Sequence, residues 1–154
     1  MPPIRSDFVE VIVFRRRGRQ TEYLLLRRSG SERPYPGIWQ VVSGRRRSRE
    51  RASTAAIREV REESGHSPLR VWSLPFVNTI YVSSLDQVQC MPTFAAELPS
   101  DAAVRLSSEH SEGRWVSMTA ARRLVLWQAH VTLISLVKDV IIPGRGWSRH
   151  TQID

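Results

Sequence analysis

The sequence contains a single cysteine, Cys90, and no uncharged apolar run as long as the ~18 residues that a membrane-spanning helix requires. One cysteine excludes an intramolecular disulfide and a cysteine-rich metal site. Cys90 lies in the apolar-rich run 88–96, which favours a buried strand residue over a reactive thiol. The apolar stretch within residues 1–14 is too short and too acidic for a secretory signal. We therefore expect a soluble, cytoplasmic protein that makes no membrane contact.

The length and composition are those of a globular chain with one core. The chain has 154 residues, of which 41% are hydrophobic and 25% charged. The formal net charge of +8 comes almost entirely from arginine. Because the planar guanidinium group suits phosphate, an anionic partner is expected. The charge alone does not distinguish a nucleotide from a nucleic acid or an acidic membrane.

The order of predicted elements indicates a mixed α/β (α+β) fold. Apolar and β-branched residues predict strands over 8–14, 23–28, 39–43, 71–82, 88–98 and 114–116. Helical spacing predicts helices over 50–64, from 117 or 119 to 125, and from about 127 to 141. Loops are expected at 15–20, 29–37 and 44–49, and fraying is expected over 144–154. Because there is no repeat or linker, we expect residues 1–154 to form one domain.

Three glutamates cluster on the predicted helix 50–64. Glu59, Glu62 and Glu63 are three and four residues apart, so they project to one side of the helix. Clustered carboxylates repel each other, and a hard divalent cation such as Mg²⁺ removes that repulsion. The alternative is a solvated acidic stripe that pairs with neighbouring arginines. Four further residues at defined spacing favour the cation site: Gly44, Glu50, Arg58 and Gly65.

The segment 44–66 resembles the Nudix box, whose pattern is Gly, five residues, Glu, seven residues, then Arg-Glu-hydrophobic-x-Glu-Glu-x-Gly-hydrophobic. Eight of the nine defined positions match, namely Gly44, Glu50, Arg58, Glu59, Val60, Glu62, Glu63 and Gly65. His66 departs from the pattern because the family usually has an aliphatic residue there. That position is one of packing at the helix exit, so the departure affects little of the catalytic chemistry.

The resemblance covers nearly the whole chain and implies the Nudix α/β/α sandwich with a mixed central sheet. The stretch 39–44, together with 108–110 and Trp115, is similar to bacterial dihydroneopterin triphosphate pyrophosphohydrolases and their dATP-cleaving relatives. Ser43 stands where many members have glycine. The loop 45–49 reads Arg-Arg-Arg-Ser-Arg where others carry an acidic residue and a glycine. Three interpretations of this loop stay open: binding of phosphate, binding of a larger anion, or a solvated surface.

The resemblance also implies a set of metal ligands. Glu59 and Glu63 are implied to bind an essential Mg²⁺, for which Mn²⁺ can substitute. Glu62 is implied to bind the metal or to hold a metal-bound water, and the backbone carbonyl of Ser43 is implied as a further ligand. In such sites the cation offsets charge that develops during phosphoryl transfer.

A second group of residues is expected to support catalysis. Arg58 and Glu50 are implied to orient the ligands, although Glu50 at the helix entrance also fits a simple favourable charge at a helix N-terminus. Glu109 matches the position of a catalytic or metal-binding glutamate in the dihydroneopterin triphosphate enzymes and is the favoured general base. Glu112 and His110 in the same segment are the alternatives.

Three residues are candidates for substrate contact. Trp39 and Phe76 are aromatic residues at strand ends that suit stacking on a base or pterin ring, with packing in the core as the alternative. Arg27 lies on the second predicted strand and is a candidate to contact the polyphosphate.

The sequence thus predicts a magnesium-dependent pyrophosphohydrolase that converts a nucleoside-triphosphate-like substrate, a dNTP or dihydroneopterin triphosphate, to monophosphate and pyrophosphate. Hydrolysis of a dinucleoside polyphosphate or nucleotide sugar is one alternative. A non-catalytic Nudix-fold module that binds nucleotide or RNA is another, less favoured because the glutamate set is intact. A homodimer is compatible with the sequence.

Overall fold

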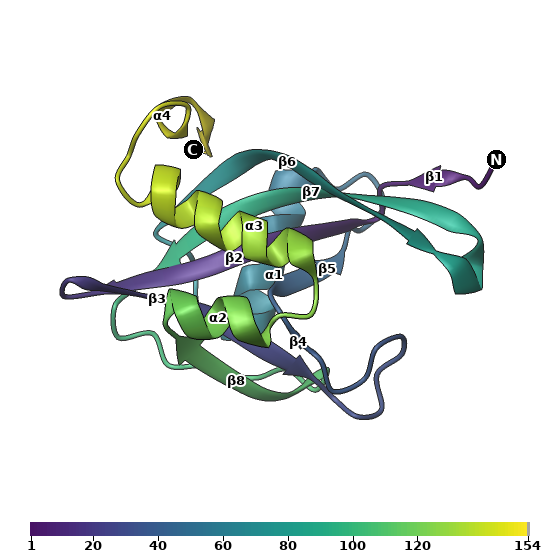
Figure 1. Ribbon diagram of the computed structural model, residues 1–154, viewed down its shortest axis with the longest axis horizontal. Coiled ribbons are helices and arrows are strands. Elements are labelled where there is room, and N and C mark those ends of the chain that lie inside the picture. Colours follow the sequence, from purple (N-terminus) through teal and green to yellow (C-terminus); the bar gives the residue numbers. More distant parts are fainter. Residues whose placement is uncertain (154) are drawn as a thin grey trace.

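The strand-forming runs pair into one mixed sheet in the computed structural model, which describes residues 1–153 (Figure 1). The strands are β1 (Ile4–Arg5), β2 (Phe8–Arg17), β3 (Gln20–Arg28), β4 (Trp39–Gln40), β5 (Val42–Arg45), β6 (Arg70–Val82), β7 (Gln87–Leu98), β8 (His110–Val116) and β9 (Gln152–Ile153). The helices are α1 (Ala52–Ser64), α2 (Met118–Leu124), α3 (Gln128–Leu136) and α4 (Ser148–Thr151). A 3-10 turn, η1 (Ser83–Leu85), joins β6 to β7, and a π-helical turn, η2 (Val137–Ile141), continues α3.

The sheet runs in the order β4-β3-β2-β7-β6-β9. Most neighbours are antiparallel, but β2 and β7 are parallel, as are β1 and β7. Off this path, β5 pairs with β2 and β8 pairs with β3. The predicted mixed α/β class and central mixed sheet are therefore confirmed.

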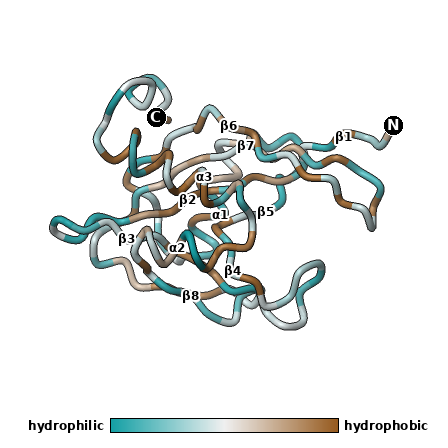
Figure 2. The backbone as a smooth tube through the Cα atoms, in the orientation of Figure 1, coloured by the Kyte–Doolittle hydropathy of each residue, from teal (hydrophilic) through white to brown (hydrophobic). Residues whose placement is uncertain are grey.

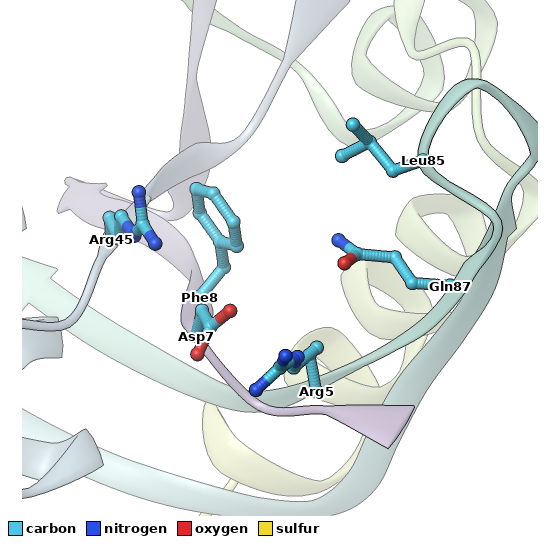
Figure 3. A pocket seen from close by; sticks show the side chains of 6 residues that line it. All are labelled: Arg5, Asp7, Phe8, Arg45, Leu85 and Gln87. Atoms are coloured by element: carbon cyan, nitrogen blue, oxygen red, sulfur yellow. The ribbon is translucent and has the colours of Figure 1, made fainter. Parts of the chain in front are cut away.

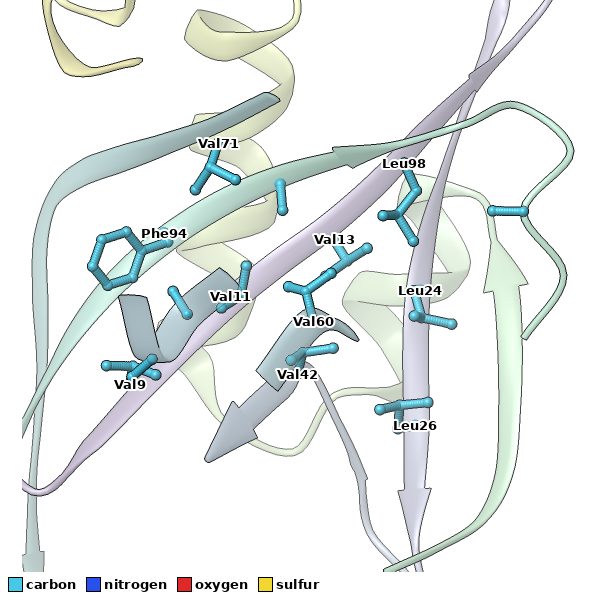
Figure 4. Close-up of a cluster of buried hydrophobic side chains, with 14 residues drawn as sticks. Val9, Val11, Val13, Leu24, Leu26, Val42, Val60, Val71, Phe94 and Leu98 are labelled. Carbon is cyan, nitrogen blue, oxygen red and sulfur yellow. The ribbon is translucent and has the colours of Figure 1, made fainter. Parts of the chain in front are cut away.

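The two faces of the sheet are covered by different helices. Alternate residues of β2 divide between two hydrophobic clusters, because successive side chains of a strand point to opposite faces. Val9, Val11 and Val13 pack with Val60 of α1 in the first cluster (Figure 4). The second cluster contains Ile12 and Phe14 with apolar residues of α2 and α3. Figure 2 shows hydrophobic residues concentrated in the central strands and hydrophilic residues at the β2–β3 turn. The result is the expected α/β/α sandwich.

Helix ends lie where local chemistry favours them. α1 is stopped by Gly65, whose φ of 77° is readily adopted by glycine. α2 begins after Ser117, whose hydroxyl accepts a hydrogen bond from the backbone N–H of Ala120. None of the helices formed by residues 1–153 has the length and apolar character needed to cross a membrane.

Several boundaries differ from those predicted. The strand expected over 39–43 divides into β4, which pairs with β3, and β5, which pairs with β2, so Gly44 lies in a strand rather than a loop. α1 begins at Ala52 instead of Glu50, because residues 46–51 form the turn that leads into it. β8 begins at His110, four residues before the predicted start.

Two expectations about single segments are wrong for tertiary reasons. The part of 144–154 that the structure describes is ordered into α4 and β9, and β9 pairs with residues 71–72 of β6. Cys90 lies in β7 as expected but is half-buried, because the β6–β7 hairpin extends away from the main body there (Figure 1).

Candidate functional site

The carboxylates of α1 meet the end of β5. Glu59 and Glu63 are buried on the side of α1 that faces the sheet, whereas Glu62 is 47% exposed. Gly44 makes this approach possible: a Cβ at that position would lie 1.9 Å from Cδ of Glu59. The backbone N–H of Ser43 lies near enough to the Glu63 carboxylate to oppose, in part, the rise in its pKa. The structure therefore brings together the predicted metal ligands Glu59, Glu63 and Ser43, with Glu62 at the solvent side.

Arg58 holds this group of side chains in place. Its Nε donates to Oε1 of Glu50 and its Nη2 to Oε2, each at 2.9 Å, which is a two-pronged ion pair. Its Nη1 donates to Glu59 at 2.5 Å and to Glu62 at 3.1 Å. Nη2 also donates to the backbone carbonyl of Arg45 at 2.9 Å. One guanidinium thus connects three carboxylates of the box to the end of β5.

Glu50 is ionised under nearly all conditions. The hydrogen bonds from Arg58 and from the backbone N–H of Arg47 lower the pKa of Glu50 to about 2. In turn, the hydrogen bond with Glu50 raises the pKa of Arg58. Glu50 therefore contributes more than a charge at the helix entrance, since it orients the arginine that contacts the other carboxylates.

Glu59 and Glu63 are poised to gain from a cation. Burial raises the pKa of Glu59 and raises that of Glu63 well above its usual range. Repulsion from Glu62 and Glu109 adds to the rise at Glu59, and repulsion from Glu59 and Glu109 adds to the rise at Glu63. Oε2 of Glu63 is buried and has no hydrogen-bond partner. A buried carboxylate oxygen without a partner is costly, and a divalent cation would supply the missing positive charge. The donor set consequently fits Mg²⁺.

The protein groups alone do not complete a coordination sphere. Within residues 1–153, no three His, Cys, Asp or Glu side chains converge closely enough to form a full ligand set. A Mg²⁺ ion held here would therefore need water and substrate oxygens in addition to the carboxylates.

The three candidate bases take different positions. Glu109 is exposed, and its charge contributes to raising the pKa of both Glu59 and Glu63, so the chain brings it to the carboxylate cluster. Glu112 pairs with Arg114 in β8. His110 is buried, its Nε2 lies 3.3 Å from Nε2 of Gln40, and burial lowers its pKa. Of the three candidates, Glu109 is the one whose charge acts on the pKa of both Glu59 and Glu63.

The proposed substrate residues lie on separate parts of the sheet: Arg27 on β3 and Trp39 on β4 are on neighbouring strands, whereas β2 and β7 separate them from Phe76 on β6. Arg27 is exposed on β3, where its Nε donates to the carbonyl of Gly37. Trp39 and Phe76 are half-buried and both pack against the second hydrophobic cluster. The guanidinium of Arg114 lies 5.0 Å from the centre of the Trp39 ring. Both aromatics therefore serve the core at least in part, and each retains exposed surface.

The arginines of loop 45–49 do not act alike. Arg46 is structural, because its side chain donates to the carbonyls of Glu50 and Ser6. Arg47 pairs with Glu62 at 3.0 Å but stays 68% exposed. Arg45 is exposed, and its guanidinium lies 6.0 Å from the ring of Phe8.

A cavity of about 440 Å³ lies next to β5 and was not found from the sequence. It is lined by Arg5, Asp7, Phe8, Arg45, Leu85 and Gln87, which Figure 3 shows around an open space. These residues come from separate segments of the chain, so no sequence motif indicates the cavity. We refer to it as the hairpin pocket.

Comparisons with known proteins agree with this geometry. Residues 7–137 match the family model described as NUDIX domain. An octanoyltransferase from Myxococcus xanthus is 38% identical over 131 residues, which cover 80% of this chain and 34% of the relative. The chain thus spans about a third of the length of that curated relative.

Solved structures share the fold. A putative NUDIX hydrolase from Listeria monocytogenes has 27% identity and a TM-score of 0.75, with 91% of this chain and 97% of that chain covered. An Ap4A hydrolase from C. elegans has 20% identity and a TM-score of 0.75, with 92% and 100% covered. The E. coli dihydroneopterin triphosphate pyrophosphohydrolase has 22% identity and a TM-score of 0.69, with 92% and 99% covered.

Proposed function

Because this chain belongs to the Nudix hydrolase family, we propose that it is a magnesium-dependent pyrophosphohydrolase that cleaves a nucleoside-triphosphate-like substrate. A dNTP or dihydroneopterin triphosphate would yield a monophosphate and pyrophosphate. We further propose that residues 1–154 act as one domain, that Mn²⁺ can replace Mg²⁺, and that the enzyme works in the cytoplasm. A homodimer is compatible with this proposal.

The observation that carries the proposal is the buried Oε2 of Glu63, which has no partner. It lies in a cluster with Glu59, whose pKa is raised by burial. Glu59, Glu63 and the carbonyl of Ser43 would hold the cation, and Glu62 at the exposed side would bind it or a water. A bound divalent cation lowers the pKa of a water and offsets charge on the phosphate oxygens.

Two residues position the ligands. Arg58 contacts Glu59 and Glu62 through Nη1, while its other nitrogens are held by Glu50 and the Arg45 carbonyl. This prevents both carboxylates from rotating away when substrate is absent. Arg58 and Glu50 thus act through the ligands rather than on the substrate.

Glu109 is proposed as the general base. Its exposed carboxylate, whose charge helps to raise the pKa of Glu59 and Glu63, would accept a proton from the water that attacks the phosphorus. The bond between that phosphorus and the bridging oxygen breaks, and the electron pair leaves with the departing phosphate group. His110 is disfavoured as the base because it is buried and its ring nitrogens lie near Gln40 and Ser107.

The substrate is proposed to lie across β3 and β4. Arg27 is exposed and carries no acidic partner among the described ion pairs, so its guanidinium is available to a phosphate. Trp39 on β4 offers its remaining exposed surface to a planar ring, and Phe76, on β6, is the candidate for a ring that reaches the other side of the sheet. Nucleic acid remains the less favoured partner, and acyl transfer, named for a much longer relative, is not proposed for this chain.

Loss of one buried carboxylate tests the function. Glu63→Gln keeps the size of the side chain and removes its charge, so kcat should fall by about 10²-fold or more and the Mg²⁺ requirement should rise. Asp101→Asn is the matched control, because Asp101 is an exposed carboxylate in the β7–β8 loop. Release of pyrophosphate and phosphate is measured over a panel of nucleotides and dihydroneopterin triphosphate.

The same assay separates the enzyme from a binding module. A non-catalytic module would bind nucleotides without Mg²⁺-dependent release of phosphate. Full activity of purified Glu63→Gln, or no difference between Glu63→Gln and Asp101→Asn, would refute the assignment.

A further inference from the structure

A second cavity, of about 190 Å³, lies between the sheet and the segment that follows α3. Three arginines line it, and each comes from a different part of the chain: Arg16 from the end of β2, Arg70 from the start of β6 and Arg149 from α4. Trp72 and residues 141–144 form much of the remaining wall. We call this cavity the arginine pocket.

The arginine pocket is separate from the carboxylate site. Gly44 of that site pairs with Val9 of β2, whereas Arg16 lies seven residues further along the same strand. At ~3.3 Å per residue, the two positions are roughly 23 Å apart. They also lie on opposite faces of the sheet, because Val9 packs in the cluster with α1, whereas Arg16 has the parity of Phe14 in the cluster with α2 and α3. The pocket is therefore no part of the proposed catalytic site.

One buried carboxylate orients two of the three guanidinium groups. Glu97 of β7 pairs with Phe14 on one side and with Arg70 on the other, so their side chains share a face of the sheet. Nε of Arg70 donates to Oε2 of Glu97 at 3.0 Å, and its Nη2 lies 2.7 Å from the same carboxylate. Nε of Arg16 lies 3.1 Å from Oε1 of Glu97, yet it is buried and forms no hydrogen bond. Glu97 thus holds two guanidinium groups and neutralises the charge of only one.

Arg149 adds a third positive charge at the same cavity. Its Nε donates to the carbonyl of Gly144 at 3.0 Å, and Gly144 itself lines the pocket. Within residues 1–153, the ion pairs of the three arginines all go to Glu97. The other residues of the lining are uncharged, so three arginines and one glutamate leave a formal charge of +2. The side chains of Arg16 and Arg70 are 38% and 46% exposed, so an anion in solution can reach them.

The shape and chemistry of the pocket suit a phosphate group without a nucleoside. The planar guanidinium fork matches pairs of phosphate oxygens, and a carboxylate has too few oxygens to engage three such groups. Trp72 is only 4% exposed, so it has no free face on which a base could stack. The volume of about 190 Å³ is smaller than the ~300 Å³ at which sites for larger organic ligands begin.

We infer that the arginine pocket binds a small phosphate anion, free phosphate or pyrophosphate, which bridges α4 to β2 and β6. The bound anion neutralises the surplus charge and fastens the segment after α3 to the sheet. This inference does not depend on the proposed hydrolysis, because it uses none of the residues assigned to catalysis.

Calorimetric titration of the full chain with sodium pyrophosphate in EDTA measures the pocket in the absence of a divalent cation. Arg149→Gln should weaken binding about tenfold or more, because it removes one of three charge-assisted contacts. Arg145→Gln is the matched control: Arg145 is exposed in the same turn but does not line the pocket, so this variant should bind like the wild type. Equal weakening in both variants would reduce the effect to net charge and overturn the inference, as would a wild type that binds no pyrophosphate.

Two glycines give a second test that leaves every arginine in place. Gly144 and Gly146 have φ of 65° and 54°, and a Cβ at either position meets nothing within 4 Å. Aspartate enters this left-handed region more readily than most residues, so the two substitutions should strain the backbone alike. Gly144→Asp places a negative charge in the lining and should weaken pyrophosphate binding about tenfold or more, whereas Gly146→Asp should not. Equal affinity in the two variants would refute the inference.

Thermal melting at constant ionic strength checks folding and the class of anion. Pyrophosphate should raise the melting temperature of the wild type and of Arg145→Gln more than that of Arg149→Gln. An equal rise with succinate would show that the pocket takes carboxylates and would overturn the inference. Pyrophosphate binding seen only in Asp154→Asn would show that the acidic residue after β9 competes for the pocket, with the same consequence. Phosphate release by Arg149→Gln should match the wild type, so failure of the proposed hydrolysis leaves these binding tests intact.

Discussion

Gly44→Ala should inactivate the enzyme without unfolding it. The added Cβ would lie 1.9 Å from Cδ of Glu59 and 2.2 Å from each of its carboxylate oxygens, whereas ordinary contacts begin at 3.4 Å. The carboxylate must therefore move by roughly 1.5 Å, which takes it away from Arg58 as well. A displacement of ~1 Å at a reacting centre costs about 10²-fold in rate. The carboxylate is the far end of a flexible side chain, so the backbone and the first hydrophobic cluster need not move.

The measurement compares kcat/KM, the Mg²⁺ dependence and the melting temperature of Gly44→Ala with those of wild type. Gly30→Ala is the matched control, because a Cβ at Gly30 meets nothing within 4 Å. We expect kcat/KM to fall about 10²-fold or more in Gly44→Ala and to stay unchanged in Gly30→Ala. Both variants should melt close to the temperature of the wild type. If kcat/KM of Gly44→Ala stays within threefold of wild type at saturating Mg²⁺, a difference of about 0.7 kcal/mol, then glycine is not needed at position 44 to make room for Glu59.

Three further predictions concern the carboxylates. Glu109→Gln should lower kcat about 10²-fold with little change in Mg²⁺ affinity. Glu112→Gln should leave kcat nearly unchanged, because Glu112 pairs with Arg114. The reverse result would show that Glu109 was matched to the wrong position of the related enzymes. In metal-free protein, the raised pKa of Glu63 means that the folded state holds a proton the unfolded state has lost. The free energy of unfolding should therefore fall as pH rises above 4.5. In urea unfolding Glu63→Gln should weaken this dependence, and the raised pKa of Glu59 accounts for the part that persists. The lowered pKa of Glu50 works in the opposite direction, so stability should be lost as pH drops from 4.5 through about 2, a loss that Glu50→Gln should abolish.

The box was predictable because its signal is local. Residues three and four apart on a helix share a face whatever the rest of the chain does, so Glu59, Glu62 and Glu63 had to cluster once α1 formed. Gly65 ends that helix through its own left-handed backbone conformation. The pairing of Arg58 with Glu62 also follows from spacing alone. The match of residues 7–137 to the NUDIX domain model confirms the family that this local pattern indicated.

Contacts between distant segments were not predictable in the same way. Residues 39–43 divide into β4 and β5 because the first half pairs with β3 and the second with β2. The C-terminal residues are ordered because β9 pairs with the edge of β6. Both outcomes depend on strands that are distant in the sequence. The sequence left Glu109 and Glu112 as alternatives because it did not predict where β8 begins: Glu112 lies in β8 opposite Arg27 of β3, whereas Glu109 precedes the strand.

The sequence by itself determined the fold class, the family and the identity of the carboxylates, since each rests on composition, periodicity or fixed spacing along the chain. Only the tertiary structure decided the charge states and the pocket. Burial of Glu63 against β5 raises its pKa, and that burial depends on the packing of α1 on the sheet. The hairpin pocket joins residues 5–8, Arg45 and residues 85–87, which lie together only because β1 and β2 pair with β7 while β5 pairs with β2.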